Sequence, residues 1–335
     1  MTLPETSKKV LFLDQNIALA WNRKNKVSSM KIAILGAGAM GSLYGAFLGE
    51  NGADVWLIDI WPEQVERLNK QGLVIEEGSN HKLYKVKATT EKEQIGPVDL
   101  ILIFVKTYQT TEALRDISPL IHKQTIFMTL QNGLGNHELL AQRFGKSAVF
   151  AGTSSFGATL IEPGRIRIAG RGETVFGACN NNYRKEDLDK LFLLFEGSQL
   201  NPRLTEDALV QIWEKLLVNV GINALTAITN VPNGYLLKND ALLSLLEEAV
   251  TEAETVARKL KVTIAPNPVE KTKKIALLTG QNFSSMHQDL HKGRQTEIDA
   301  INGKVAELGS EIDLNTPVNK TLTLLIKAIT EIKKK

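Results

Sequence analysis

The sequence predicts a doubly wound α/β domain followed by an all-helical domain. Apolar, strand-like runs alternate with helical segments between residues 31 and 130, a pattern typical of a parallel sheet with right-handed crossovers. Short strands separated by Gly and Pro turns follow between Ala148 and Gly177, and they predict an antiparallel extension of that sheet. From Glu206 onward only helical periodicity is found. We therefore expect an N-terminal domain over residues 30–203 and a helical domain over residues 204–335.

The elements of the first domain follow from local patterns. The segment 98–105 is almost continuously apolar, as expected for a strand buried on both faces of a parallel sheet, and Pro62 suits the first turn of a helix. The expected strands are 31–36, 54–59, 98–105 and 125–130, with a hairpin over 73–87. The expected helices are 40–51, 62–71, 109–121 and 188–196.

The second half reads as a series of helices. Pro266 and Pro317 are placed as first-turn residues, where the missing N–H costs nothing. The expected helices are 207–230, 239–260, 266–279, 293–309 and one that begins at Pro317.

Composition excludes several classes of protein. The 335 residues carry 40 basic and 37 acidic side chains without a basic patch with interleaved aromatics, so no nucleic-acid partner is expected. The longest apolar run, Leu100–Val105, is far too short to span a membrane. The single cysteine, Cys179, excludes an intramolecular disulfide and favours a cytoplasmic protein. Oligomeric state is open between monomer and homodimer.

Residues 1–29 precede the first expected strand and contain no intact signal-peptide core, because Asp14, Gln15 and Asn16 interrupt their apolar run. We expect either a natural start at Met30 or a poorly packed extension.

A glycine fingerprint joins the first strand to the first helix. Gly36 permits a tight turn, Gly38 lets the backbone approach a pyrophosphate, and Gly41 lets the helix lie close to the strand. The phosphates would lie at the helix N-terminus, where free N–H groups and the helix dipole favour negative charge. This predicts a Rossmann-type dinucleotide site. Its loop residues are Gly36, Ala37, Gly38, Ala39, Met40 and Gly41.

An acidic residue ends the second strand at the position the fingerprint requires. Asp59 stands 23 residues after Gly36, where a carboxylate hydrogen-bonds a ribose hydroxyl and repels the 2′-phosphate of NADP. No Arg occurs among the next three residues, so NADH is favoured over NADPH. The alternative is that Asp59 only caps the following helix.

Two further candidates end later strands, where ligands bind in open α/β sheets. These are Lys106 and Asn132. Asn132 is a candidate to hydrogen-bond the cofactor ribose or the substrate, although Asn132-Gly133 is also a plain turn signal.

A polar stripe marks the first helix of the second half. Lys215, Asn219 and Asn223 are spaced four apart and share one helix face, while the other faces are apolar. Burying these groups without partners costs several kcal/mol, so we expect them to face a polar cavity. A desolvated lysine has a lowered pKa and suits proton transfer near neutral pH. The alternative is three ordinary helix-packing polar residues.

Downstream, Ser284 and Ser285 can cap a helix or bind an anion, and Glu297 opposite Lys215 would form a charged pair around a small polar substrate. The five histidines have no metal-ligand spacing, so no metal site is expected.

Taken together, these motifs resemble the ketopantoate reductase (2-dehydropantoate 2-reductase) family along nearly the whole chain from Met30. The matching segments are Gly36–Gly41, Val105-Lys106, Gln131–Gly133, the Lys215/Asn219/Asn223 helix, Asn230–Gly234, Ser284–Met286 and Arg294–Gly303. The resemblance implies an all-helical second domain like the C-terminal domain of 6-phosphogluconate dehydrogenase. It also implies NAD(P)H-dependent reduction of 2-dehydropantoate to (R)-pantoate, a step toward pantothenate and coenzyme A.

By the family pattern Lys215 donates a proton to the keto oxygen, and Glu297 anchors the substrate hydroxyl and orients Lys215. Lys106 and Asn132 line the cofactor side. The implied substrate-binding residues are Asn219, Asn223, Asn282 and Ser285.

One position departs from the family pattern. Members that use NADPH, the family default, typically carry an Arg at or beside the end of the second strand, where this chain has Asp59. The alternatives are a related 2-keto acid, hydroxyacid or polyol-phosphate dehydrogenase on the same scaffold, and a non-catalytic NAD(P)-sensing protein. A sensing protein has no need of the buried proton donor that the Lys215 stripe predicts.

Overall fold

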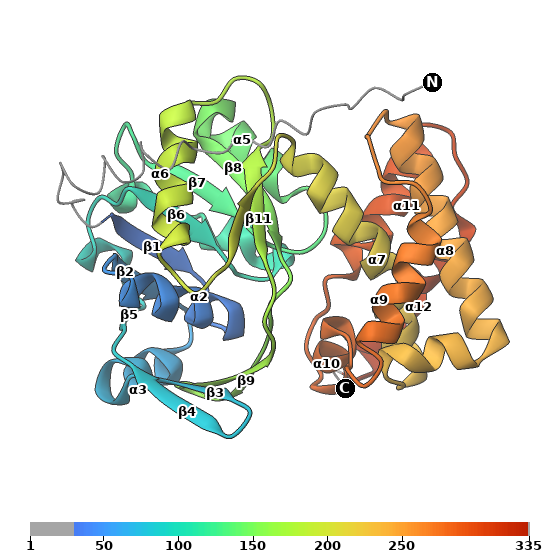
Figure 1. Cartoon of the computed structure of the whole chain (residues 1–335), viewed down its shortest axis with the longest axis horizontal. Coiled ribbons are helices and arrows are strands. Elements are labelled where there is room, and N and C mark those ends of the chain that lie inside the picture. Colours follow the sequence, from blue (N-terminus) through green and yellow to red (C-terminus); the bar gives the residue numbers. More distant parts are fainter. Residues whose placement is uncertain (1–29, 334–335) are drawn as a thin grey trace, which may run out of the picture.

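The computed structural model describes residues 30–333, and in it the chain divides into a sheet-containing part and a helical part (Figure 1). The expected segment 1–29 lies outside the described residues. The order of sheet first and helices second confirms the predicted fold class.

The main sheet has eight strands in the order β12-β11-β8-β7-β6-β1-β2-β5. Neighbouring strands from β8 to β5 pair in parallel, whereas β11 runs antiparallel to β8. The prediction of a doubly wound sheet with an antiparallel extension is therefore confirmed. The strands are β1 (Lys31–Leu35), β2 (Asp54–Ile58), β5 (Lys87–Thr89), β6 (Leu100–Ile103), β7 (Ile126–Thr129), β8 (Val149–Ser154), β11 (Thr174–Ala178) and β12 (Pro202–Leu204).

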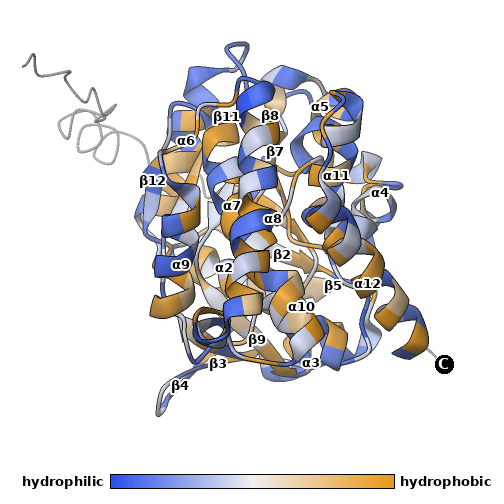
Figure 2. Cartoon of the chain, turned by 90° about the vertical axis from the view of Figure 1, so that its right-hand side faces the viewer, coloured by the Kyte–Doolittle hydropathy of each residue, from blue (hydrophilic) through white to orange (hydrophobic). Residues whose placement is uncertain are grey.

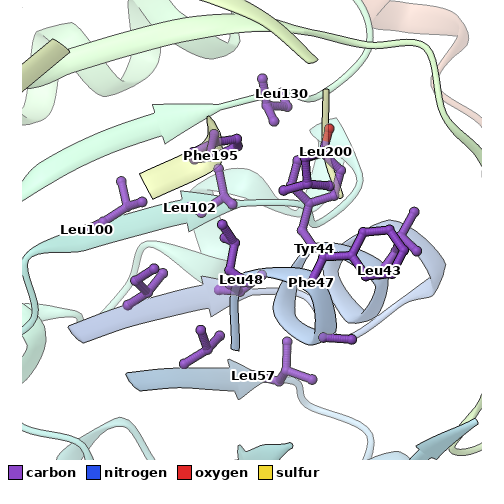
Figure 3. Close-up of a cluster of buried hydrophobic side chains, with 14 of the residues drawn as sticks. Leu43, Tyr44, Phe47, Leu48, Leu57, Leu100, Leu102, Leu130, Phe195 and Leu200 are labelled. Carbon is purple, nitrogen blue, oxygen red and sulfur yellow. The ribbon is translucent and has the colours of Figure 1, made fainter. Parts of the chain in front are cut away.

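Apolar residues cover both faces of this sheet because successive side chains of a strand point to opposite sides. Ile32 and Ile34 pack with one group of helices, and Ala33 and Leu35 with another. The first group is α2 (Ala39–Glu50), α3 (Pro62–Gln71) and α6 (Lys185–Glu196), and the second is α4 (Thr110–Ala113) and α5 (Asn136–Phe144). Figure 3 shows part of this core: Leu43, Phe47 and Leu48 of α2 belong to the same buried cluster as Leu57, Leu100 and Leu102 of the strands.

A second, four-stranded sheet has the order β4-β3-β10-β9, and it corrects one expectation. Its strands are β3 (Leu73–Glu77), β4 (Asn80–Tyr84), β9 (Gly157–Glu162) and β10 (Arg165–Gly170). The sequence placed β9 and β10 in the extension of the first sheet, but β10 instead pairs in parallel with β3. The buried Glu76 carboxylate joins the two strands by ion pairs of 2.6 Å to Arg165 and 2.7 Å to Arg167. Periodicity reveals a strand but not a partner about 90 residues away.

The single helix expected over 109–121 is also wrong. The chain forms instead the short helix α4 between two 3₁₀ turns, η2 (Thr107–Gln109) and η3 (Ser118–Leu120). Asp116 adopts a left-handed backbone with φ of 51°, and Pro119 has no N–H to donate, so the helix cannot continue.

The helical part is built around α7, whose side chains are buried on most sides. Figure 2 views the molecule from this side and shows hydrophilic and hydrophobic residues alternating along the helices that surround α7. These elements are α7 (Ala208–Thr229), η5 (Asn233–Lys238), α8 (Asp240–Lys259), α9 (Pro268–Leu278), α10 (Ser285–His291), η6 (Ile298–Ala300), α11 (Asn302–Glu311) and α12 (Pro317–Lys333).

Two boundaries in this part differ from the prediction. The helix expected at 293–309 begins only at Asn302, and α10 was not predicted; Gly293, with φ of 66°, separates the two. Helix α9 begins at Pro268 rather than Pro266. Strand β12 of the main sheet ends at Leu204, and α7 begins at Ala208.

Candidate active site

A cavity of about 860 Å³ lies between the carboxyl ends of the parallel strands and helices α7 and α10. This volume is within the range of small-molecule and cofactor sites. Twelve of the predicted site residues line it: Gly36, Gly38, Ala39, Met40, Asp59, Lys106, Asn132, Lys215, Asn219, Asn223, Ser285 and Glu297.

The glycine loop forms one wall of the cavity and fits a dinucleotide. A Cβ at Gly38 would meet no atom within 4 Å, so the backbone there faces open space. A Cβ at Gly36 would lie 2.8 Å from the Val105 nitrogen, and one at Gly41 would lie 1.9 Å from the Gly36 oxygen. The backbone at Gly38 is therefore exposed to a ligand at the N-terminus of α2, a favourable place for a pyrophosphate.

Two loop residues support this wall from outside the cavity. Ala37 is fully buried, and its carbonyl accepts hydrogen bonds from Ser42 Oγ at 2.9 Å and Gln64 Nε2 at 2.7 Å. Gly41 packs against Gly36, as its expected role requires. Neither residue lines the cavity, and both contribute to the shape of the loop.

Asp59 lines the cavity at the end of β2 and also organises the backbone around it. One carboxylate oxygen accepts the Ala37 N–H at 2.7 Å, and the other accepts the Trp61 N–H at 3.0 Å. The second bond fixes the turn that leads into α3. The capping alternative is wrong, because the N-cap residue of α3 is Trp61 and no side chain caps the helix. A carboxylate has about four acceptor positions, so capacity for a ribose hydroxyl remains.

The polar stripe of α7 faces the cavity, as predicted. Lys215 is partly buried, and its Nζ donates a 2.7 Å hydrogen bond to the backbone oxygen of Ser154 in β8. Burial of the amine lowers the pKa of Lys215 to about 8, although the negative charge of Glu297 opposes the shift. A lysine with this pKa is mostly charged at pH 7 and still releases its proton readily.

Glu297 accepts hydrogen bonds from the N-terminal domain rather than from Lys215. Its carboxylate receives the Thr107 N–H at 3.1 Å, the Thr107 hydroxyl at 3.2 Å and Asn132 Nδ2 at 3.3 Å, and Lys106 Nζ lies 3.6 Å away. The expected direct pair between Glu297 and Lys215 is therefore replaced by an electrostatic influence without contact. Asn132 takes part in this network and also precedes the tight turn at Gly133, whose φ is 82°.

The two serines have different positions. Ser284 is buried, and its hydroxyl accepts the His287 N–H at 3.1 Å, so it caps α10. Ser285, the first residue of α10, lines the cavity.

Asn282 is not brought to the cavity. It is exposed in the turn before α10, where its N–H bonds to Thr279 and its carbonyl oxygen accepts the Asn233 N–H at 2.9 Å. These backbone bonds tie the turn to η5 rather than to the cleft, so the structure gives no support to a substrate-binding role.

Sequence reasoning missed several residues of the site. Thr107 bonds to Glu297, and Asp289 bonds to Lys106. The spacing of four between Ser285 and Asp289, which places both on one helix face, was an available signal. No signal in the sequence pointed to the contact of 3.4 Å between the side chains of Thr159 in β9 and Gln288 in α10, because the two residues are 129 positions apart.

Two features are absent from residues 30–333, a metal-binding cluster and a membrane-spanning helix. No group of three or more His, Cys, Asp or Glu side chains there could hold a metal ion. Within the same residues, no helix combines the length and the apolar character needed to cross a bilayer.

Comparison with known proteins agrees with the two-part architecture. Residues 32–181 match the family model described as ketopantoate reductase PanE/ApbA, and residues 207–330 match the model of its C-terminal domain. A 2-dehydropantoate 2-reductase of Pyrococcus horikoshii is 38% identical over 299 residues, which cover 89% of this chain and 97% of the relative. The chain belongs to the ketopantoate reductase family.

Solved structures of the family and its neighbours superpose closely. The 2-dehydropantoate 2-reductase of Geobacter metallireducens has a TM-score of 0.84 at 30% identity, and the match covers 89% of this chain and 99% of that one. A D-mandelate dehydrogenase solved with NADH and anilino(oxo)acetate has a TM-score of 0.85 at 30% identity, with 91% and 100% covered. Ketopantoate reductases thus share this scaffold with an enzyme of a different 2-hydroxy acid.

Proposed function

We propose that this protein reduces 2-dehydropantoate to (R)-pantoate with a nicotinamide dinucleotide, and that Lys215 is the general acid. The observation that carries the proposal is the partly buried amine of Lys215, which faces the same cavity as the glycine loop. The names of the relatives support the choice of substrate.

The bound cofactor supplies the hydride, and the residues of this chain supply the proton and the orientation. The Lys215 ammonium donates a proton to the keto oxygen as negative charge develops there. The Ser154 carbonyl, which accepts one amine hydrogen, fixes the direction of the side chain. Asn219 and Asn223 present carboxamides to the substrate from the next two turns of α7.

The polar ends of the substrate are assigned to two further residues. The Ser285 hydroxyl faces the cavity and is proposed to bind the substrate carboxylate. Glu297 is proposed to accept a hydrogen bond from the substrate hydroxyl, because Lys106, Thr107 and Asn132 hold its carboxylate in place.

The substrate assignment is tested by steady-state kinetics on purified protein. We expect kcat/KM for 2-dehydropantoate to exceed that for an aromatic 2-keto acid, measured with each nicotinamide cofactor. A preference for the aromatic compound would replace this assignment by one closer to the mandelate dehydrogenase.

The two directions of the reaction should depend on pH with opposite sign. Reduction needs the Lys215 ammonium, so kcat/KM for the keto acid should fall above about pH 8, where burial places the pKa of this lysine. Oxidation of pantoate needs the neutral amine and should rise over the same interval. Initial rates from pH 6 to 10 in both directions measure this, and parallel profiles would contradict a role for Lys215 in proton transfer.

We further propose that Asp59 makes NADH the preferred cofactor. Two of the cations that line the cavity are already engaged: Lys92 bonds the carbonyl of Ala113 at 3.1 Å, and Arg115 pairs with Glu112 at 2.7 Å. Within residues 30–333, the Asp59 carboxylate accepts two backbone N–H groups and forms no ion pair, which favours a ribose hydroxyl over a 2′-phosphate beside it.

Asp59→Asn keeps one acceptor oxygen and removes the charge. We expect the ratio of kcat/KM for NADPH to that for NADH to rise by about tenfold or more, equivalent to about 1.4 kcal/mol. Asp54→Asn is the matched control, since Asp54 begins the same strand and pairs with Lys87. An unaltered ratio in Asp59→Asn would reduce Asp59 to a residue that holds the turn.

A further inference from the structure

Asp289 is a carboxylate of the cleft that has no role in the proposed proton transfer or substrate binding. It lies in α10, is 7% exposed, and lines the cavity. Its Oδ2 is 2.6 Å from the Nζ of Lys106, which belongs to the other domain. A buried charge that binds across two domains is costly unless it is paired, so its presence points to a role in the arrangement of the site.

Lys106 is shared between two carboxylates. Its amine is 2.6 Å from Asp289 and 3.6 Å from Oε2 of Glu297, which is itself 7% exposed. Although burial opposes it, the two carboxylates raise the pKa of Lys106 well above its usual value, so the lysine stays charged. The Lys106 ammonium is therefore the shared partner of two carboxylates and lies nearer to that of Asp289.

We propose that Asp289 is a positioning residue that draws the Lys106 ammonium toward itself, so that Glu297 keeps enough negative charge to support the ammonium of Lys215. This inference rests on the proposed role of Lys215 as the proton donor. It assigns to Asp289 an action through Lys106 and Glu297, without contact with the substrate.

Two further observations concern the charges that act on Lys215 and on Tyr108. Glu297 is the charge that raises the pKa of Lys215 against the effect of burial. The charges of Lys106, Asp289, Glu297 and Arg294 all act on Tyr108 of η2, and burial raises the pKa of Tyr108 so that it stays neutral.

Removal of the Asp289 charge should lower the pKa of Lys215. In Asp289→Asn, the Lys106 ammonium loses its nearer ion partner and is expected to turn to Glu297 alone, which neutralises that carboxylate. The net charge near Lys215 also becomes more positive by one. Both changes disfavour a second ammonium, so the pKa of Lys215 should fall below that of the wild type.

A substitution at Lys106 should change the pKa of Lys215 in the opposite direction. In Lys106→Met, the positive charge is removed while Glu297 and Asp289 remain, so the pKa of Lys215 should rise. If the ion pair had a purely structural role, both variants would lose stability, but the pKa of Lys215 would not shift in opposite directions in the two variants.

The experiment measures the pH dependence of acetylation of Lys215 by acetic anhydride in the full-length, cofactor-free protein, followed by peptide mass spectrometry. Only the neutral amine reacts, so the midpoint reports the pKa of Lys215. We expect a midpoint lowered by about one pH unit in Asp289→Asn, raised in Lys106→Met, and close to the wild type in Asp289→Glu. Asp299→Asn is the control, because Asp299 is near Glu297 in sequence but pairs with Lys327 at 2.6 Å.

The same shifts in midpoint pH should appear where kcat/KM for keto acid reduction falls at high pH. A midpoint that stays in place in both Asp289→Asn and Lys106→Met, or moves in the same direction in both, overturns the inference. If Asp289→Asn does not fold, Lys106→Met and Asp289→Glu still decide it. Because acetylation needs neither substrate nor cofactor, failure of the proposed function would appear separately, as absent turnover in the wild type.

Discussion

Lys215→Ala should lower kcat for reduction of the keto acid by about 10²–10⁴-fold, the usual contribution of a positioned general acid. The amine is the group of α7 that can give a proton to the substrate, and its pKa of about 8 leaves it charged at neutral pH. The dinucleotide site lies on the other side of the cavity, so the dissociation constant for NADH, measured by fluorescence titration, should change little.

Two comparisons make this result specific. Lys273→Ala removes a lysine of α9 that pairs with Glu247 and Glu270, and it should leave kcat unchanged. Added ammonium or methylamine should restore part of the activity of Lys215→Ala, since the truncated side chain leaves room for a small amine. Full turnover in Lys215→Ala would exclude Lys215 as the proton donor.

Gly41→Ala should destabilise the N-terminal domain by about 3 kcal/mol, the upper end of the usual cost of overpacking, and weaken NADH binding strongly. The new Cβ would lie 1.9 Å from the Gly36 carbonyl oxygen, so α2 must move away from the loop that receives the pyrophosphate. Thermal unfolding and NADH titration measure the two effects.

A second glycine of α2 provides a control variant that should change stability in the opposite direction. Gly49 lies in α2, and a methyl group added there would meet no atom within 4 Å. Gly49→Ala should therefore stabilise the helix by about 0.5–1 kcal/mol through lower backbone entropy of the unfolded chain. If both alanine variants bind NADH as the wild type does, close contact at Gly41 is not needed for the loop.

Local patterns were sufficient for much of this molecule. The glycine loop, the acid at Asp59 and the stripe on α7 were all predicted, and the cavity is lined by Gly38, Asp59 and Lys215 as expected. Each depends on spacing within one strand–turn–helix unit or one helix face, and such spacing is set by backbone periodicity.

Other parts depended on neighbours that the sequence does not reveal. The pairing of β10 with β3 and the breaks in the segment 109–121 were predicted wrongly. Asn282 matched a motif by its position in the chain, yet its backbone bonds hold it at the surface.

By itself, the sequence determined the two-part architecture, the dinucleotide loop and the face of α7 that carries the candidate acid. Only the tertiary structure decided that Glu297 bonds to Thr107 and Asn132, and that Lys106 lies between Glu297 and Asp289. The physical reason is that periodicity fixes which residues share a face, whereas contacts between residues more than 160 positions apart arise only when the two domains meet.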